Sequence, residues 1–164
     1  MDTGIPGDFL TRVDNIKVSV VRGNYAVHKP LLLLFALGRV QRREPQFTPF
    51  KVIEQELSPS LRTYWIQKGS PEVLDPFWLL QHDLLWEVRC EDRSKLILKK
   101  GKQDEPTLTS LREADASGGF PDHYYRQLSQ SPELIESAAR LLLSKYFQGH
   151  LPQRVASDVG LALL

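Results

Sequence analysis

Basic residues are concentrated in one short stretch of an otherwise nearly neutral sequence. The chain has 164 residues and a formal net charge of +1, yet residues 93–103 hold five basic residues and no acidic one. Arg39, Arg42 and Arg43 form a second basic group. A local excess of this kind can bind an anion on one face of a protein. It also fits a solvated, lysine-rich hairpin edge that resists aggregation, so both interpretations are open.

Side chains that commonly bind metals or act as nucleophiles are scattered along the chain. The four histidines lie far apart in the sequence, at His28, His82, His123 and His150. Cys90 is the single cysteine, which excludes a zinc site built from several thiolates. Gly101-Lys102 is followed by Gln103, so the phosphate-loop pattern is absent. We therefore predict no metal site and no cofactor.

The motifs of common nucleases are also missing. The two asparagines, Asn15 and Asn24, both precede the first histidine, His28. A linear His…Asn…His metal-finger motif therefore cannot be assembled, and no Glu-x-Lys or Gln-x-Lys completes a carboxylate–lysine core. We expect this chain not to be an enzyme and to contain no catalytic residue.

Hydrophobic spacing predicts helices in the first third of the chain, then strands, then helices again. The first helices are predicted over 8–22 and 30–43, and a third is expected from Thr48-Pro49 to an interruption at 58–60. The apolar runs 77–80 and 84–88 predict a β-hairpin whose turn is 81–83, and 95–98 predicts a third strand. Residues 118–119 are expected to form a loop. Later helices are predicted over 122–129, from the N-cap Ser131 onward, and over 152–159.

This order of elements predicts one α+β domain over residues 1–164, mainly helical with a small antiparallel β-hairpin or sheet. A helical core followed by a hairpin is similar to a winged helix. The N-terminus lacks the pattern of a signal peptide, and the longest apolar run, 31–37, is far shorter than a membrane span. Together with the single cysteine, these features predict a cytoplasmic protein without a membrane partner.

Several short motifs resemble one known family. They are Tyr25–Val40, which contains His-Lys-Pro-Leu-Leu-Leu-Leu, together with 47–50, 75–81, 85–88, 118–121 and 158–161. In this combination they resemble the sulfur-binding domain of phosphorothioate-dependent type IV restriction endonucleases, from about residue 8 to the C-terminus. Members of that family usually carry a His-Asn-His (HNH) nuclease domain after the recognition domain. The resemblance therefore identifies this chain as the recognition domain alone, with an HNH nuclease domain in the parent protein.

The resemblance implies binding of phosphorothioated double-stranded DNA, in which sulfur replaces one non-bridging phosphate oxygen. It places the phosphorothioate-binding site at His28 and Lys29 on one side and at Asp75, Pro76 and Leu79 on the other. The family often has an aromatic residue where this chain has Asp75. His28 and Lys29 also lie at the predicted start of a helix, whose free N–H groups attract anions. Without the resemblance, a capping histidine and an exposed lysine would explain both residues.

Further DNA contacts are expected from the basic residues. Lys99, Lys100 and Lys102 surround Gly101 and are candidates for contacts with base edges, although contact with phosphates alone is an equal alternative. Arg39 is a candidate phosphate contact, or a cation that favours the C-terminal end of a helix. Two other functions stay open at this point: a general winged-helix-like DNA-binding regulator without sulfur specificity, and a small protein-interaction domain.

Overall fold

The molecule is built around one buried helix, α2 (His28–Gln41), as its apolar sequence predicted. The computed structural model describes residues 6–99, 101 and 105–164. The four consecutive leucines 31–34 are at most 1% exposed, because helices pack on all sides of α2. Its neighbours are α3 (Phe50–Tyr64), α4 (Leu74–Leu79), α6 (Asp122–Gln130) and α7 (Pro132–Tyr146).

The helices of the C-terminal third begin and end close to their predicted positions. The Ser131 hydroxyl accepts a hydrogen bond of 3.1 Å from the Leu134 N–H, and Pro132 is the first residue of α7, which confirms the predicted N-cap. The chain ends with α8 (Pro152–Asp158), which packs against α7.

The first helix is shorter than predicted. Helix α1 (Pro6–Asp14) packs on α7 and is followed by a small antiparallel hairpin of β1 (Val20–Val21) and β2 (Asn24–Tyr25). Arg22 and Gly23 form the turn, with φ of 52° and 80°. The prediction over 8–22 was wrong at its end because valines favour extended structure and a two-residue turn with positive φ suits a hairpin.

A three-stranded antiparallel sheet joins distant parts of the sequence. Its order is β3 (Thr48–Pro49), β5 (Ala116–Gly119), β4 (Glu87–Cys90). The predicted loop at 118–119 is therefore wrong. A Cβ on Gly118 would lie 2.6 Å from both Phe77 Cε1 and Trp86 Nε1, so glycine is required there for two rings to pack on the strand.

The predicted hairpin over 77–88 is also wrong. Residues 77–79 end α4, and the chain continues as the 3₁₀ helix η1 (Leu80–Asp83) before β4. Phe77 and Leu80 are fully buried, and a short, fully buried apolar run has the same composition in a helix and in a strand.

Two smaller predictions failed in the same part of the fold. In place of the strand predicted over 95–98, Lys95 ends η2 (Arg93–Lys95), and Leu98 forms an isolated bridge with Pro106 before α5 (Leu108–Glu113). Residues 48–49 are strand β3, and α3 starts at Phe50 and runs through Pro59 without interruption. The domain is nevertheless α+β and mainly helical, as predicted, with its sheet made from distant strands.

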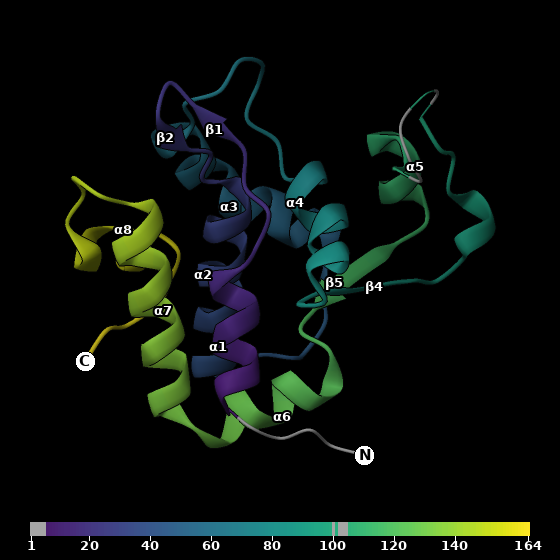
Figure 1. Cartoon of the computed structure of the whole chain (residues 1–164). Coiled ribbons are helices and arrows are strands. Elements are labelled where there is room, and N and C mark those ends of the chain that lie inside the picture. The colour runs from purple at the N-terminus through teal and green to yellow at the C-terminus, as the bar shows by residue number, and fades with distance from the viewer. Residues whose placement is uncertain (1–5, 100, 102–104) are drawn as a thin grey trace.

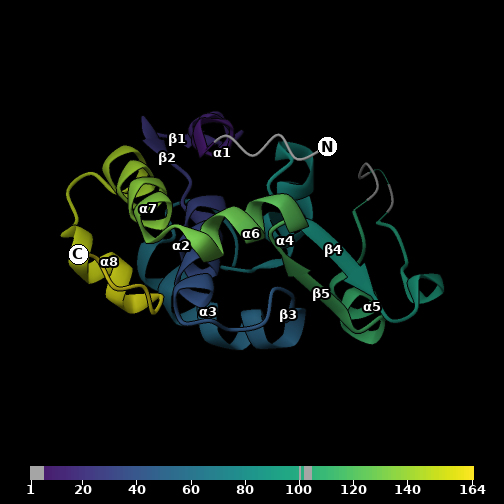
Figure 2. The same ribbon diagram turned by 90° about the horizontal axis from the view of Figure 1, so that it is seen from below.

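The elements divide the molecule into two flanks on either side of α2 (Figures 1 and 2). Helices α7 and α8 lie on one flank, and the sheet strands β4 and β5 with α5 lie on the other. The β1–β2 hairpin and the segment 65–73 between α3 and α4 both lie at the upper end of Figure 1. Within the part of the chain that the structure describes, no helix is long and apolar enough to cross a membrane.

Candidate nucleic-acid interface

His28 is the first residue of α2 and lies half-buried beneath the segment that links α3 to α4. The amide Nε2 of Gln67 lies 2.9 Å from His28 Nδ1, and the ring of Trp65 lies 5.9 Å from the imidazole. Burial and the neighbouring ammonium of Lys29 lower the pKa of His28 to about 4. His28 is therefore a neutral imidazole at neutral pH, placed at the end of a helix where backbone N–H groups are free.

Lys29 is buried and paired, in contrast to the exposed cation that sequence reasoning considered. Its Nζ donates a hydrogen bond of 2.7 Å to Asp83 Oδ2, and the two side chains are 9% and 5% exposed. Asp83 also accepts a 3.0 Å hydrogen bond from the backbone N–H of Lys17. The pair ties the start of α2 to the end of η1. Asp83 was predicted to be only a turn residue, and nothing in the sequence links it to a lysine 54 positions earlier.

The second group of predicted site residues lies in α4, which packs against α2. Pro76 is buried, Leu79 is half-buried and Asp75 lies in the first turn. The fold therefore brings the two predicted halves of the site onto neighbouring helices. Pro76 carries no backbone N–H, which suits a position in the first turn of a helix.

Asp75 belongs to a cluster that joins α4 to the basic segment. Its carboxyl group hydrogen-bonds the buried Glu105, and burial together with this neighbour and Glu72 raises the pKa of Asp75 to about 6. Lys99 Nζ in turn donates a 2.8 Å hydrogen bond to Glu105 Oε1. The nearby ammonium of Lys99 thus offsets part of the negative charge of this acidic pair.

Of the described basic residues predicted to contact DNA, the structure places only Lys99 beside Asp75. Lys99 lies in the cluster, whereas Lys100 and Lys102 fall outside the described residues. Arg39 sits in the last turn of α2, about 16 Å along the helix from His28. Its side chain is 14% exposed and lies 3.9 Å from Glu44.

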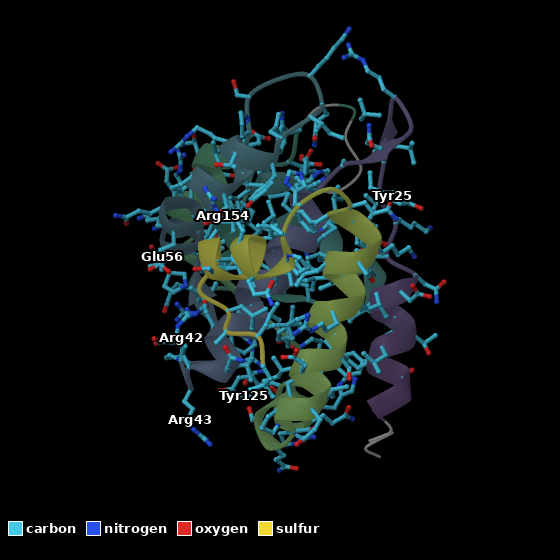
Figure 3. All side chains as sticks on the ribbon, turned by 90° about the vertical axis from the view of Figure 1, so that its left-hand side faces the viewer. Tyr25, Arg42, Arg43, Glu56, Tyr125 and Arg154 are labelled. Atoms are coloured by element: carbon cyan, nitrogen blue, oxygen red, sulfur yellow. The ribbon has the colours of Figure 1, made fainter. Side chains whose placement is uncertain are left out.

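Figure 3 shows the same separation between the two ends of α2. Arg42 and Arg43 lie at the lower end of the molecule, and Tyr25 lies at the upper end. Tyr25 lies three residues before the start of α2, and Arg42 directly follows its end. The three arginines of the second basic group therefore lie away from His28. They do not form one surface with the predicted sulfur site.

Two cations that sequence reasoning missed lie in the two segments beside the start of α2, the β1–β2 hairpin and residues 65–73. Arg22 is exposed at the turn of the β1–β2 hairpin, and Lys68 is exposed directly after Gln67. Among the described residues neither side chain has an ion-pair partner. Their only signal in the sequence was a basic residue within a turn, which is common on any protein surface.

The comparisons with known proteins point to one family. The model of the family "ScoMcrA-like, DNA sulfur-binding domain" matches residues 6–164. The sulfur-binding domain of ScoMcrA, solved as a complex with phosphorothioated DNA, is 34% identical with a TM-score of 0.83, covering 93% of this chain and 95% of that one. The sulfur-binding domain of SprMcrA, in the same kind of complex, shares the fold at 24% identity and a TM-score of 0.77, covering 98% of this chain and 97% of that one.

A third structure is the whole of ScoMcrA, described as a type IV phosphorothioation-dependent restriction endonuclease. It is 32% identical with a TM-score of 0.80 over 93% of this chain, and the match covers 27% of the endonuclease. Among curated proteins, none is significantly similar to this sequence.

Proposed function

This chain belongs to the ScoMcrA-like DNA sulfur-binding domain family, and on that premise we propose that it binds double-stranded DNA carrying phosphorothioate groups. The observation that carries the proposal is the likeness to the ScoMcrA domain, which was solved as a complex with phosphorothioated DNA. That likeness extends over 93% of this chain at 34% identity, and the family model matches residues 6–164, a range that contains both predicted halves of the site.

The physical task is to separate sulfur from oxygen on the same phosphate. Sulfur is larger and more polarizable than oxygen and accepts hydrogen bonds more weakly. An apolar wall receives sulfur at low desolvation cost but penalises an oxygen that must give up its water. We assign Pro76 and Leu79 to this wall and His28 to the facing side. The burial of Pro76 and the packing of α4 on α2 support the assignment.

Lys29 and Asp75 have supporting parts in this proposal. Because the ammonium of Lys29 is held by Asp83, we propose that its aliphatic stem adds to the apolar wall while its charge stays paired. Asp75 contributes backbone and position, and the ammonium of Lys99, which is paired with Glu105, offsets part of the negative charge beside the phosphate. We assign Lys99, Arg22 and Lys68 to the electrostatic attraction of the other DNA phosphates, with Lys100 and Lys102 as further candidates.

The chain acts as the recognition part of a restriction system. Its own residues offer no nuclease motif, and we propose that cleavage comes from an HNH nuclease domain in the parent protein, which the chain directs to modified DNA. The whole ScoMcrA endonuclease, of which the matching region is 27%, supports this arrangement. A general DNA-binding regulator and a protein-interaction domain lack comparable support.

Replacement of Pro76 by serine tests the site. Pro76→Ser adds a hydrogen-bonding group to the apolar wall, so the difference in binding free energy between modified and plain duplex should shrink by about 1–3 kcal/mol. Pro45→Ser is the matched control, because Pro45 is exposed beyond the far end of α2. Both variants are titrated with a duplex that carries one phosphorothioate and with the same duplex without it, at one salt concentration. A folded Pro76→Ser variant that keeps the full sulfur preference would place the pocket elsewhere.

A further inference from the structure

The imidazole of His28 has two nitrogens, and only one of them has a partner among the described residues. Nδ1 lies 2.9 Å from the amide nitrogen of Gln67. That amide nitrogen can only donate, so Nδ1 must be the acceptor and the ring proton must sit on Nε2. The ring has two alternative tautomers only because it is neutral, since a charged imidazolium would carry a proton on both nitrogens.

The amide of Gln67 is turned with its nitrogen toward the imidazole ring. Its oxygen, Oε1, is buried and has no hydrogen-bond partner among the described residues. The hydrogen bond to His28 Nδ1 is therefore the one polar contact that the described structure gives this amide.

We propose, resting on the function proposed above, that Gln67 is a positioning residue that holds His28 in the tautomer with its proton on Nε2. In this tautomer the free nitrogen presents an N–H donor to the phosphorothioate group. In the other tautomer the same nitrogen would present a lone pair, which repels an anion. Gln67 therefore decides whether the neutral ring attracts or repels its ligand, without adding any charge to an apolar site.

His28 is suited to such control because of its place in the fold. It begins α2, where the helix dipole disfavours a positive charge, and Lys29 adds a further positive group beside it. Protonation is therefore suppressed, and the hydrogen bond from Gln67 selects between the two neutral tautomers of the ring. The nitrogen Nε2 is not among the buried polar atoms without a partner, which fits an atom open to a ligand.

Nitrogen NMR of the free protein tests the proposal without any DNA. Long-range ¹H–¹⁵N correlation spectra of histidine-labelled protein, with His28 assigned from a His28→Asn variant, report which ring nitrogen is protonated. At pH 7 we expect Nδ1 to be unprotonated and Nε2 protonated. Gln67→Glu should reverse this, because a carboxylate accepts a hydrogen bond and so requires a proton on Nδ1. Gln148→Glu is the control, since it makes the same change at an exposed residue.

Binding is then measured with the phosphorothioated duplex. Gln67→Leu should weaken it by about three- to tenfold, the range expected for one hydrogen bond, and Gln148→Leu should leave it unchanged. A protonated Nδ1 in the native protein, or a His28 spectrum that Gln67→Glu does not alter, would overturn the inference. Failure of the native protein to bind the modified duplex would instead refute the proposed function, and the NMR result would stand apart from it.

Discussion

The buried ion pair between Lys29 and Asp83 gives the most quantitative prediction of the structure. We expect Asp83→Asn and Lys29→Met each to destabilise the fold by about 3–5 kcal/mol, because each leaves one buried charge without a partner. The estimate follows from the 2.7 Å distance, side-chain exposures of 9% and 5%, and the Lys17 N–H that Asp83 also accepts. In the variant that carries both Lys29→Met and Asp83→Leu, apolar packing should recover most of the loss.

A second ion pair of the same residue types serves as the control. Lys51 lies 3.7 Å from Asp115, and these side chains are 64% and 62% exposed. An exposed pair of this kind contributes about 0–1 kcal/mol. Urea unfolding of the single and double variants of both pairs gives two coupling energies. If the coupling of Lys29 with Asp83 were no larger than that of the exposed pair, the argument from burial would be wrong.

The same variants test how Lys29 takes part in binding. Because its charge is already paired, Lys29→Met should leave the salt dependence of DNA binding nearly unchanged once folding is confirmed. A drop of about 0.9 in the slope of log affinity against log salt would mean that Lys29 neutralises a phosphate directly.

Three further predictions concern other parts of the structure. The pKa of Asp75 in the folded state, raised to about 6, lies above its value in the unfolded chain, so the folded state binds more protons between pH 4 and 6 and its stability falls as pH rises through this range. Compared with the Asp75→Asn variant, the native protein should lose on the order of 1 kcal/mol of unfolding free energy over this range, after allowance for solvent screening, in thermal and urea unfolding. Parallel pH dependences of the two proteins would contradict this prediction. Arg22→Ala combined with Lys68→Ala should weaken modified and plain DNA alike and lower the salt slope by up to about 2, whereas an unchanged slope would remove both from the interface. Gly118→Ala should destabilise the fold by about 1–3 kcal/mol in urea unfolding, because its Cβ would meet two aromatic rings; a neutral result would show that the rings can shift.

The sequence predicted the helices whose signals are local. The start of α7 follows from Ser131 and Pro132, which act within one helical turn. The run of leucines identified α2 as the central helix because a helix that is apolar on all sides must be buried. In contrast, the buried run 77–80 was taken for a strand, since its length and composition fit either element. A small antiparallel sheet was predicted, but its strand pairing was not, because the strands come from distant parts of the chain and no local pattern reports such pairing.

The candidate site, like the fold, could be predicted from the sequence only in part. Its position at the start of α2 could be predicted, because His28 precedes a strongly helical run. The partners of the two residues could not be predicted, because Asp83 and Gln67 meet Lys29 and His28 only through the tertiary fold. Contacts between residues 39 and 54 positions apart leave no trace in spacing. The contact with Asp83 pairs the charge of Lys29, and the contact with Gln67 occupies Nδ1 of His28 and, within the described part of the chain, leaves Nε2 free.

The central claim is that this domain distinguishes sulfur from oxygen on a DNA phosphate. The most direct test is a paired titration of the native chain with one duplex, prepared with and without a single phosphorothioate, at one fixed salt concentration. We predict tighter binding of the modified duplex by about 1–3 kcal/mol, or roughly 5- to 150-fold in the dissociation constant. Equal affinities for the two duplexes would contradict sulfur recognition and leave a general DNA-binding domain, and absence of binding to both would contradict DNA recognition altogether.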